Sequence, residues 1–155
     1  MTKEIIVIIV SWVISIYCLL KYVPRERLRE AHISLLMSQT LAWIFEFIQV
    51  HFELVEFPFR EFHNATKMSF SLHYIVLPSF GVFFILLYPL KKGLYRRILH
   101  YLIFSAALPS YTSIVEHFTS LIEFKKWNWF IAVCANFILL WILKKFVFWF
   151  RKELT

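Results

Sequence analysis

Five apolar runs, each about 20 residues long, constrain this chain more than any other feature of its sequence. An α-helix needs a run of that length to cross the hydrocarbon core of a bilayer, and a soluble core does not. The composition agrees, because 60% of the 155 residues are hydrophobic, against about 45–50% in soluble domains. The sequence therefore predicts an all-α polytopic transmembrane helical bundle that forms one domain. The predicted spans are residues 4–22, 31–52, 69–90, 98–118 and 127–146, with a loop at 53–68.

The first apolar run resembles a secretory signal peptide, because Lys3 precedes it. No small-residue cleavage site follows the run, and Pro24 comes next in its place together with several arginines. We therefore expect a first helix that is retained in the membrane.

The basic residues predict how the spans are oriented. Twelve of the 17 lysines and arginines lie in three clusters, at residues 21–29, 91–97 and 144–152. An odd number of spans puts all three clusters on one side, and cytoplasmic loops carry the excess of Lys and Arg. The N-terminus is therefore expected outside and the C-terminus in the cytoplasm. Because the net charge of +7 comes from short loops, nucleic acid is not an expected partner.

Polar side chains recur on single faces of four predicted helices, in the outer half of the membrane. An ionisable group inside a bilayer costs roughly 2.5–3.5 kcal/mol at mid-depth, so it usually faces protein or water. Helical spacing places Glu46 and Gln49 on one face of the second span. We expect these faces to form one shared polar pocket, open outward, below the loop at 53–68. The candidates on the other three spans are His73, Glu116, His117 and Asn136.

Arg60 lies in this loop, and its planar guanidinium suits a bidentate carboxylate. One interpretation is that Arg60 bridges to the loop's own carboxylates or to Glu116, which would pin the loop over the pocket. The other is that it presents its charge to an anionic ligand or a lipid headgroup. The bridge is the favoured interpretation.

Two prolines and a candidate cap are expected to shape the helices. Pro78 and Pro109 fall near the middle of the third and fourth spans, so both helices are expected to kink there. Asn64 or Thr66 is expected to cap the third helix, because both are good N-cap types and an apolar run follows.

No motif in the sequence defines a reaction: there is no HExxH, P-loop, CxxC or nucleophile elbow. We therefore favour a non-enzymatic binding or accessory protein without a cofactor, whose partners are the lipid bilayer and a small ligand or partner membrane protein. A homo-oligomer is a further option. One alternative is a small transporter or proton-coupled subunit, and another is that the polar groups only organise the bundle. A third is an intramembrane metal-dependent enzyme with a metal site made of Glu46, His73, Glu116 and His117.

Five stretches stand out: "KYVPRERLREA", "SQTLAWIFEF", "LVEFPFREFHNATKMSFSLHYIVLP", "FFILLYPL" and "EFKKWNWF". They resemble the corresponding stretches of a family of small multi-pass membrane proteins from spore-forming Gram-positive bacteria, and the resemblance covers nearly the whole chain. The resemblance implies an α-helical fold in a bacterial plasma membrane and supplies no reaction or substrate. The family often has Glu where this chain has His73, which weakens a metal-binding role for that position. The most specific residues are Glu56, Pro58, Arg60, Glu61, Phe62, Ala65, Thr66, Lys67, Ser69 and Phe70.

Overall fold

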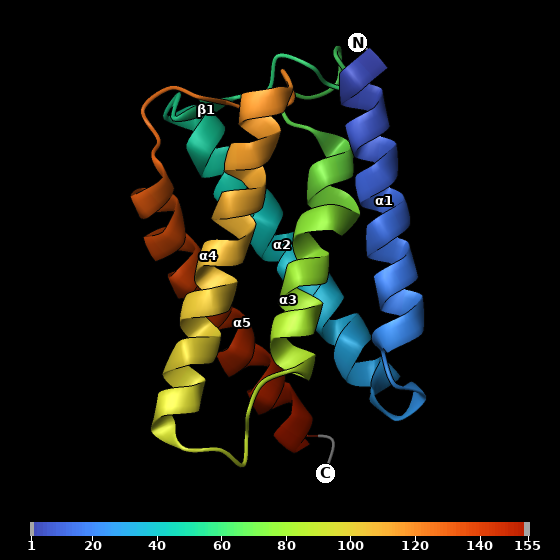
Figure 1. Cartoon of the computed structure of the whole chain (residues 1–155), viewed down its shortest axis with the longest axis vertical. Coiled ribbons are helices and arrows are strands. Elements are labelled where there is room, and N and C mark those ends of the chain that lie inside the picture. Colours follow the sequence, from blue (N-terminus) through green and yellow to red (C-terminus); the bar gives the residue numbers. More distant parts are fainter. Residues whose placement is uncertain (1, 154–155) are drawn as a thin grey trace.

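The chain forms a bundle of five helices, and the computed structural model describes residues 2–153. The structure is 75% helical, which confirms the all-α prediction. Two short turns, η1 and η2, precede the second and third helices, and two-residue strands pair at one end of the bundle (Figure 1). The elements are α1 Thr2–Tyr22, η1 Arg25–Arg27, α2 Leu28–His51, β1 Val55–Glu56, η2 Leu72–Val76, α3 Leu77–Leu86, α4 Leu94–Phe118, β2 Glu123–Phe124 and α5 Trp129–Glu153.

Four of the described helices, α1, α2, α4 and α5, are long and apolar enough to cross a membrane. The third predicted span differs, because its apolar helix covers only Leu72–Leu86 and ends before the predicted boundary at Leu90. Pro89 lies just beyond this end, and proline cannot continue a helix. Helix α5 instead runs past the predicted end at Phe146, because neither proline nor glycine interrupts it before Glu153.

The arrangement of the helices places chemically different loops at opposite ends of the bundle. Helix α3 lies between α1 and α4 in Figure 1, while α2 and α5 cross behind them. The loops at 53–68 and 119–128 share the end that carries the N-terminus, which we call the hairpin end. The opposite end, which we call the basic end, carries the loops after α1 and α3 and the last turns of α5. The three clusters of lysine and arginine therefore lie together at the basic end.

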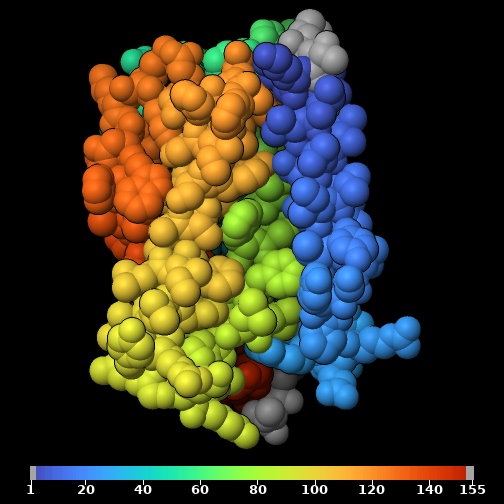
Figure 2. Space-filling view, in the orientation of Figure 1, coloured from blue at the N-terminus to red at the C-terminus, as the bar shows by residue number. Residues whose placement is uncertain are grey.

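Helix α1 forms one edge of the bundle and is the helix most open to its surroundings. In Figure 2 it covers one side of the molecule, with α3 visible between it and α4. The side chain of Val13 is 60% exposed and that of Ile6 is 55% exposed, which suits contact with lipid tails. Several contacts hold α1 in place: for example, Trp12 stacks on Tyr74 with ring centroids 6.3 Å apart, and Ser11 Oγ lies 2.8 Å from the Tyr111 hydroxyl on α4.

The hairpin end is closed by a pairing between two loops that are far apart in the sequence. Strand β1 pairs antiparallel with β2, with Val55 opposite Phe124. Lys125 lies 2.6 Å from Glu123 and 3.4 Å from Glu56, and its hydrogen bond to Glu123 raises the pKa of the Lys125 ammonium. The loop at 53–68 is therefore tied to the loop at 119–128 across the top of the bundle.

Close approach of α2 and α3 depends on a glycine. A Cβ atom built on Gly81 would lie 2.1 Å from Ser38 Oγ and 3.0 Å from a methyl carbon of Leu143. Small residues at helix contacts let membrane helices approach closely, because lipid supplies no hydrophobic drive between them. The contact between Gly81 and Ser38 therefore sets the spacing of α2 and α3.

We predict that Gly81→Ala lowers the free energy of unfolding by about 1–3 kcal/mol, because the added methyl overfills the contact with Ser38. The matched control is Gly93→Ala, since no atom lies within 4 Å of a Cβ built at that position. Unfolding of both variants in bicelles by added SDS measures the difference. Equal stability of the two variants would contradict the close contact.

Candidate functional site

A cavity of about 130 Å³ lies inside the bundle between α2, α3, α4 and α5. Most of its wall is aliphatic or aromatic, and polar side chains reach it from several helices. At the hairpin end Val55 and Phe124, one from each strand, belong to its lining. Four of the seven predicted site residues line this cavity: Glu46, Gln49, His73 and Asn136. Its other polar lining residues are Ser38 and Thr112.

A widened turn positions His73 at the cavity. The turn η2 is a π-helix in which the Leu77 N–H donates to the Leu72 carbonyl, five residues earlier. Pro78 follows directly, and its ring would clash with the carbonyl four residues before it in a regular helix. The π-turn relieves this crowding, and such turns occur often at functional sites. His73, which lies in this turn, is only 2% exposed.

The turn η2 and helix α3 together form one apolar stretch, Leu72–Leu86, which we call the third helical segment. His73 on this segment and Glu46 on α2 form a buried pair. His73 Nε2 lies 2.8 Å from Glu46 Oε2, and the two side chains are 2% and 5% exposed. The Trp43 ring packs on the imidazole with centroids 5.8 Å apart, and the edge of Phe57 meets it at 5.7 Å. The pair is therefore enclosed by aromatic rings.

Hydrogen-bond chemistry determines the net charge of this pair. His73 Nδ1 lies 2.7 Å from the Ser69 carbonyl oxygen, which can only accept, so Nδ1 carries a proton. The contact between Nε2 and Glu46 Oε2 needs one further proton, held either by the imidazole or by the carboxyl. Imidazolium with carboxylate and imidazole with carboxylic acid both sum to zero. The pair therefore carries no net charge.

Asn136 satisfies a carbonyl that a proline leaves open. Pro109 in α4 has no N–H to donate to the carbonyl of Ser105, four residues earlier. The Asn136 side-chain amide on α5 donates to Ser105 O and to Phe104 O, both at 3.2 Å. In a membrane helix such a carbonyl has to find its partner within the protein. The predicted pocket residue Asn136 thus has a structural partner on the neighbouring helix.

Gln39 and Pro78 repeat this arrangement between α2 and the third helical segment. Pro78 cannot donate to the Tyr74 carbonyl, and the Gln39 amide donates to it at 2.5 Å. At both prolines, therefore, an amide from a neighbouring helix meets the carbonyl that the proline leaves open. The second helix meets the third segment through Glu46, which the sequence placed on a polar face, and through Gln39 and Trp43.

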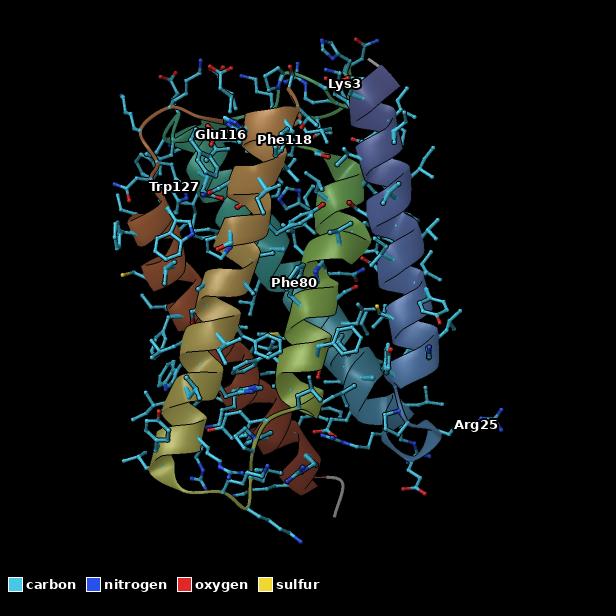
Figure 3. The ribbon with its side chains drawn as sticks, viewed as in Figure 1. Lys3, Arg25, Phe80, Glu116, Phe118 and Trp127 are labelled. Carbon is cyan, nitrogen blue, oxygen red and sulfur yellow. The ribbon has the colours of Figure 1, made fainter. Side chains whose placement is uncertain are left out.

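Glu116 and His117 do not belong to the cavity, which corrects the predicted pocket. Glu116 lies at the hairpin end of α4, where its Oε1 accepts the backbone N–H of Phe124 at 3.0 Å (Figure 3). It therefore holds β2 in place. His117 is exposed and meets the edge of the Phe118 ring. Helical spacing predicts the face on which Glu116 lies but not its depth. Glu116 lies in the last turn of α4, level with the strands and beyond the cavity.

The metal site considered from the sequence is also not formed. Of its four predicted ligands only Glu46 and His73 meet, while Glu116 bonds a backbone amide and His117 is exposed. Within residues 2–153, no three His, Cys, Asp or Glu side chains are placed to hold a metal ion together.

Arg60 does not form the favoured carboxylate bridge in the described part of the chain. Its guanidinium contacts His63 Nε2 at 3.4 Å, and its Nε atom is buried without a partner. Glu61, the nearest candidate partner, instead accepts the backbone N–H groups of Phe70 and Ser71, both at 3.1 Å. A carboxylate suits a helix N-terminus because the free N–H groups there carry partial positive charge.

The cap of the third helical segment is therefore Glu61 and not the predicted Asn64 or Thr66. Thr66 Oγ1 accepts the Met68 N–H at 3.1 Å within the loop. Sequence reasoning missed this cap because Glu61 lies nine residues before the amide it binds. It also missed Ser38 and Gly81 in the cavity lining, although a mid-helix glycine in a chain with two glycines was a usable signal.

Comparisons with family models, with curated proteins and with solved structures find no match to this chain. Function is therefore argued from the geometry of the cavity and from the distribution of charge.

We predict that Asn136→Leu costs about 1 kcal/mol of stability in the wild-type chain and clearly less in a Pro109→Ala background. Alanine at position 109 restores an N–H that bonds the Ser105 carbonyl, so the Asn136 amide is no longer needed. A double-mutant cycle on bicelle unfolding measures the coupling between the two positions.

The matched control combines Asn136→Leu with Pro78→Ala, since the carbonyl that Pro78 leaves open, that of Tyr74, is bonded by Gln39 on another helix. These two changes should add within error. If the stability changes of Asn136→Leu and Pro109→Ala also add, then Asn136 does not bond the carbonyl that Pro109 leaves open.

Proposed function

We propose that this chain is an integral membrane protein that binds a small, mainly apolar molecule in the cavity between α2 and α5. The single observation that supports this is the cavity itself, of about 130 Å³ with walls from four helices. Apolar cavities of about this size in proteins can hold a benzene-sized molecule. Ligand sites are typically apolar with a few polar groups that fix orientation, which matches this lining.

A holding role fits the site better than a chemical one. Glu116, His117 and Arg60 lie away from the cavity or face other partners. The Asn136 amide is committed to two carbonyls, and both nitrogens of His73 have partners. Few of the groups that a reaction would need are therefore free at the cavity, which supports a binding or accessory protein.

The proposal includes a five-span topology in a bacterial plasma membrane with the hairpin end outside. Collection of the twelve basic residues at the opposite end supports this orientation through the positive-inside rule. The third helical segment, Leu72–Leu86, is short but lies alongside its longer neighbours (Figure 1), which supports counting it as the fifth crossing. In this orientation Glu46, Gln49 and His73 lie in the outer half of the bilayer.

Photolabelling tests the proposed cavity. An alkyl diazirine with about six carbons, irradiated with the full-length protein in nanodiscs, should label cavity residues such as Thr112 as well as lipid-facing residues. Ala132→Phe fills the cavity wall and should remove the cavity label while leaving the label at Phe130, which is 75% exposed. The matched control is Ala135→Phe on the same helix, because Ala135 does not line the cavity. Labelling confined to lipid-facing residues in the wild-type protein would refute a ligand cavity.

Cysteine labelling on intact cells tests the orientation. In a chain without Cys18 and Cys134, we expect a membrane-impermeant maleimide to modify His63→Cys in the loop at the hairpin end. Lys92→Cys, in an exposed position at the basic end, should react only after the cells are permeabilised. The reverse labelling pattern would show that the protein has the opposite orientation in the membrane.

A further inference from the structure

Gln49 is a polar cavity residue whose side-chain amide has no hydrogen-bond partner in the described part of the protein. It is 7% exposed and lines the cavity near the hairpin end. Within residues 2–153 its side-chain amide makes no hydrogen bond, although an amide offers two donor hydrogens and one acceptor oxygen. The protein therefore leaves this amide available, and a group that enters the cavity can bond it.

Glu46 lies one helical turn from Gln49 on the same face of α2. Its Oε2 atom is taken by His73, while its Oε1 atom is buried and has no partner. Together the two side chains offer acceptor oxygens and a donor amide within one turn. This combination matches a ligand group that both donates and accepts hydrogen bonds.

The charge at this site selects among such groups. Because the Glu46–His73 pair carries no net charge, the cavity offers no counter-charge to an ionised head group. Lys and Arg are absent from the lining. Moving an ionised group from water into such a site is far more costly than moving a hydroxyl or amide. An uncharged head group is therefore favoured over an ammonium or a carboxylate.

The cavity changes in character along the membrane normal. Near Gln49 its wall is aromatic, with Phe45 and Trp127 in edge contact at 5.8 Å. Toward the basic end it is mainly aliphatic, with Leu140 and Leu143 among its lining and the Ser38 hydroxyl as a polar group there. Gln49 lies eleven residues after Ser38 on α2, which corresponds to about 16 Å at 1.5 Å per residue. A polar head at the outer end and a short apolar tail below it fit this gradient.

We propose, on the basis of the function proposed above, that the ligand is an uncharged amphiphile whose hydroxyl or amide head meets Gln49 and Glu46. Its tail lies along the leucine-lined part of the cavity, pointing toward the basic end. The same orientation is that of a membrane lipid in the outer leaflet, so the ligand can enter with its head already at the right depth.

A matched series of photoprobes tests this inference on the full-length protein in nanodiscs. Four alkyl diazirines of equal length end in a methyl, hydroxyl, ammonium or carboxylate group, and each is compared at equal concentration in the membrane. We expect the hydroxyl probe to label cavity residues at least about fivefold more than either charged probe. In Gln49→Leu the hydroxyl probe should fall to the level of the methyl probe. The control Thr40→Val removes a polar group from an exposed position of α2 outside the cavity and should keep the preference for the hydroxyl probe.

The outcomes separate the two proposals. If no probe labels the cavity, the proposed function fails. If the methyl probe labels it but a charged probe labels it as well as or better than the hydroxyl probe, binding stands and the uncharged head group is wrong. If the folded Gln49→Leu variant still prefers the hydroxyl probe over the methyl probe, then Gln49 does not bind the head group. The comparison of probes on the wild-type protein remains decisive even where a variant does not fold.

Discussion

The polar groups of this bundle are arranged by one constraint: inside a bilayer, each backbone carbonyl or amide needs a partner within the protein. Pro78 and Pro109 each leave a carbonyl open in the middle of a helix. A side-chain amide from the neighbouring helix meets each one, Gln39 at Tyr74 and Asn136 across Phe104 and Ser105. These bonds join α2 to the third segment and α5 to α4. The carbonyls that the two prolines leave open therefore become contacts between neighbouring helices.

The cavity is a consequence of the same alignment. The π-turn before Pro78 carries His73 toward Glu46, which fixes one wall and leaves a pair without net charge. Gly81 and Ser38 bring α2 and α3 together toward the basic end, and the paired strands cover the hairpin end. Between these two closures the helices enclose a space lined mainly by apolar side chains. Once the structural bonds are made, the polar groups at the cavity that lack a protein partner in the described residues include Glu46 Oε1, Ser38 Oγ and the Gln49 amide.

The sequence predicts the coarse architecture well, because hydrophobic run length and helical spacing are local properties. The all-α class, most helix bounds, and the meeting of Glu46 with His73 follow from them. The failures arise where a side chain finds a partner that is distant in the sequence. Glu61 reaches the N–H groups of the third segment, and Glu116 reaches a strand amide, so neither serves the role that spacing alone assigned. Helix spacing also shows which face carries a polar group but not whether that group is already bonded, as Asn136 is.

The contact between His73 and Glu46 is the most direct test of this account, because it requires the π-turn, the depth of both helices and a shared proton at once. Solid-state NMR in lipid bilayers, on protein with isotope-labelled histidine and glutamate, measures it, with His73→Phe used to assign the signal. The account predicts a dipolar coupling between His73 Nε2 and the Glu46 carboxyl carbon that fits an N–O distance of 2.8 Å, with a proton on Nδ1. Absence of that coupling, or a His73 ring with a bare Nδ1, would contradict it.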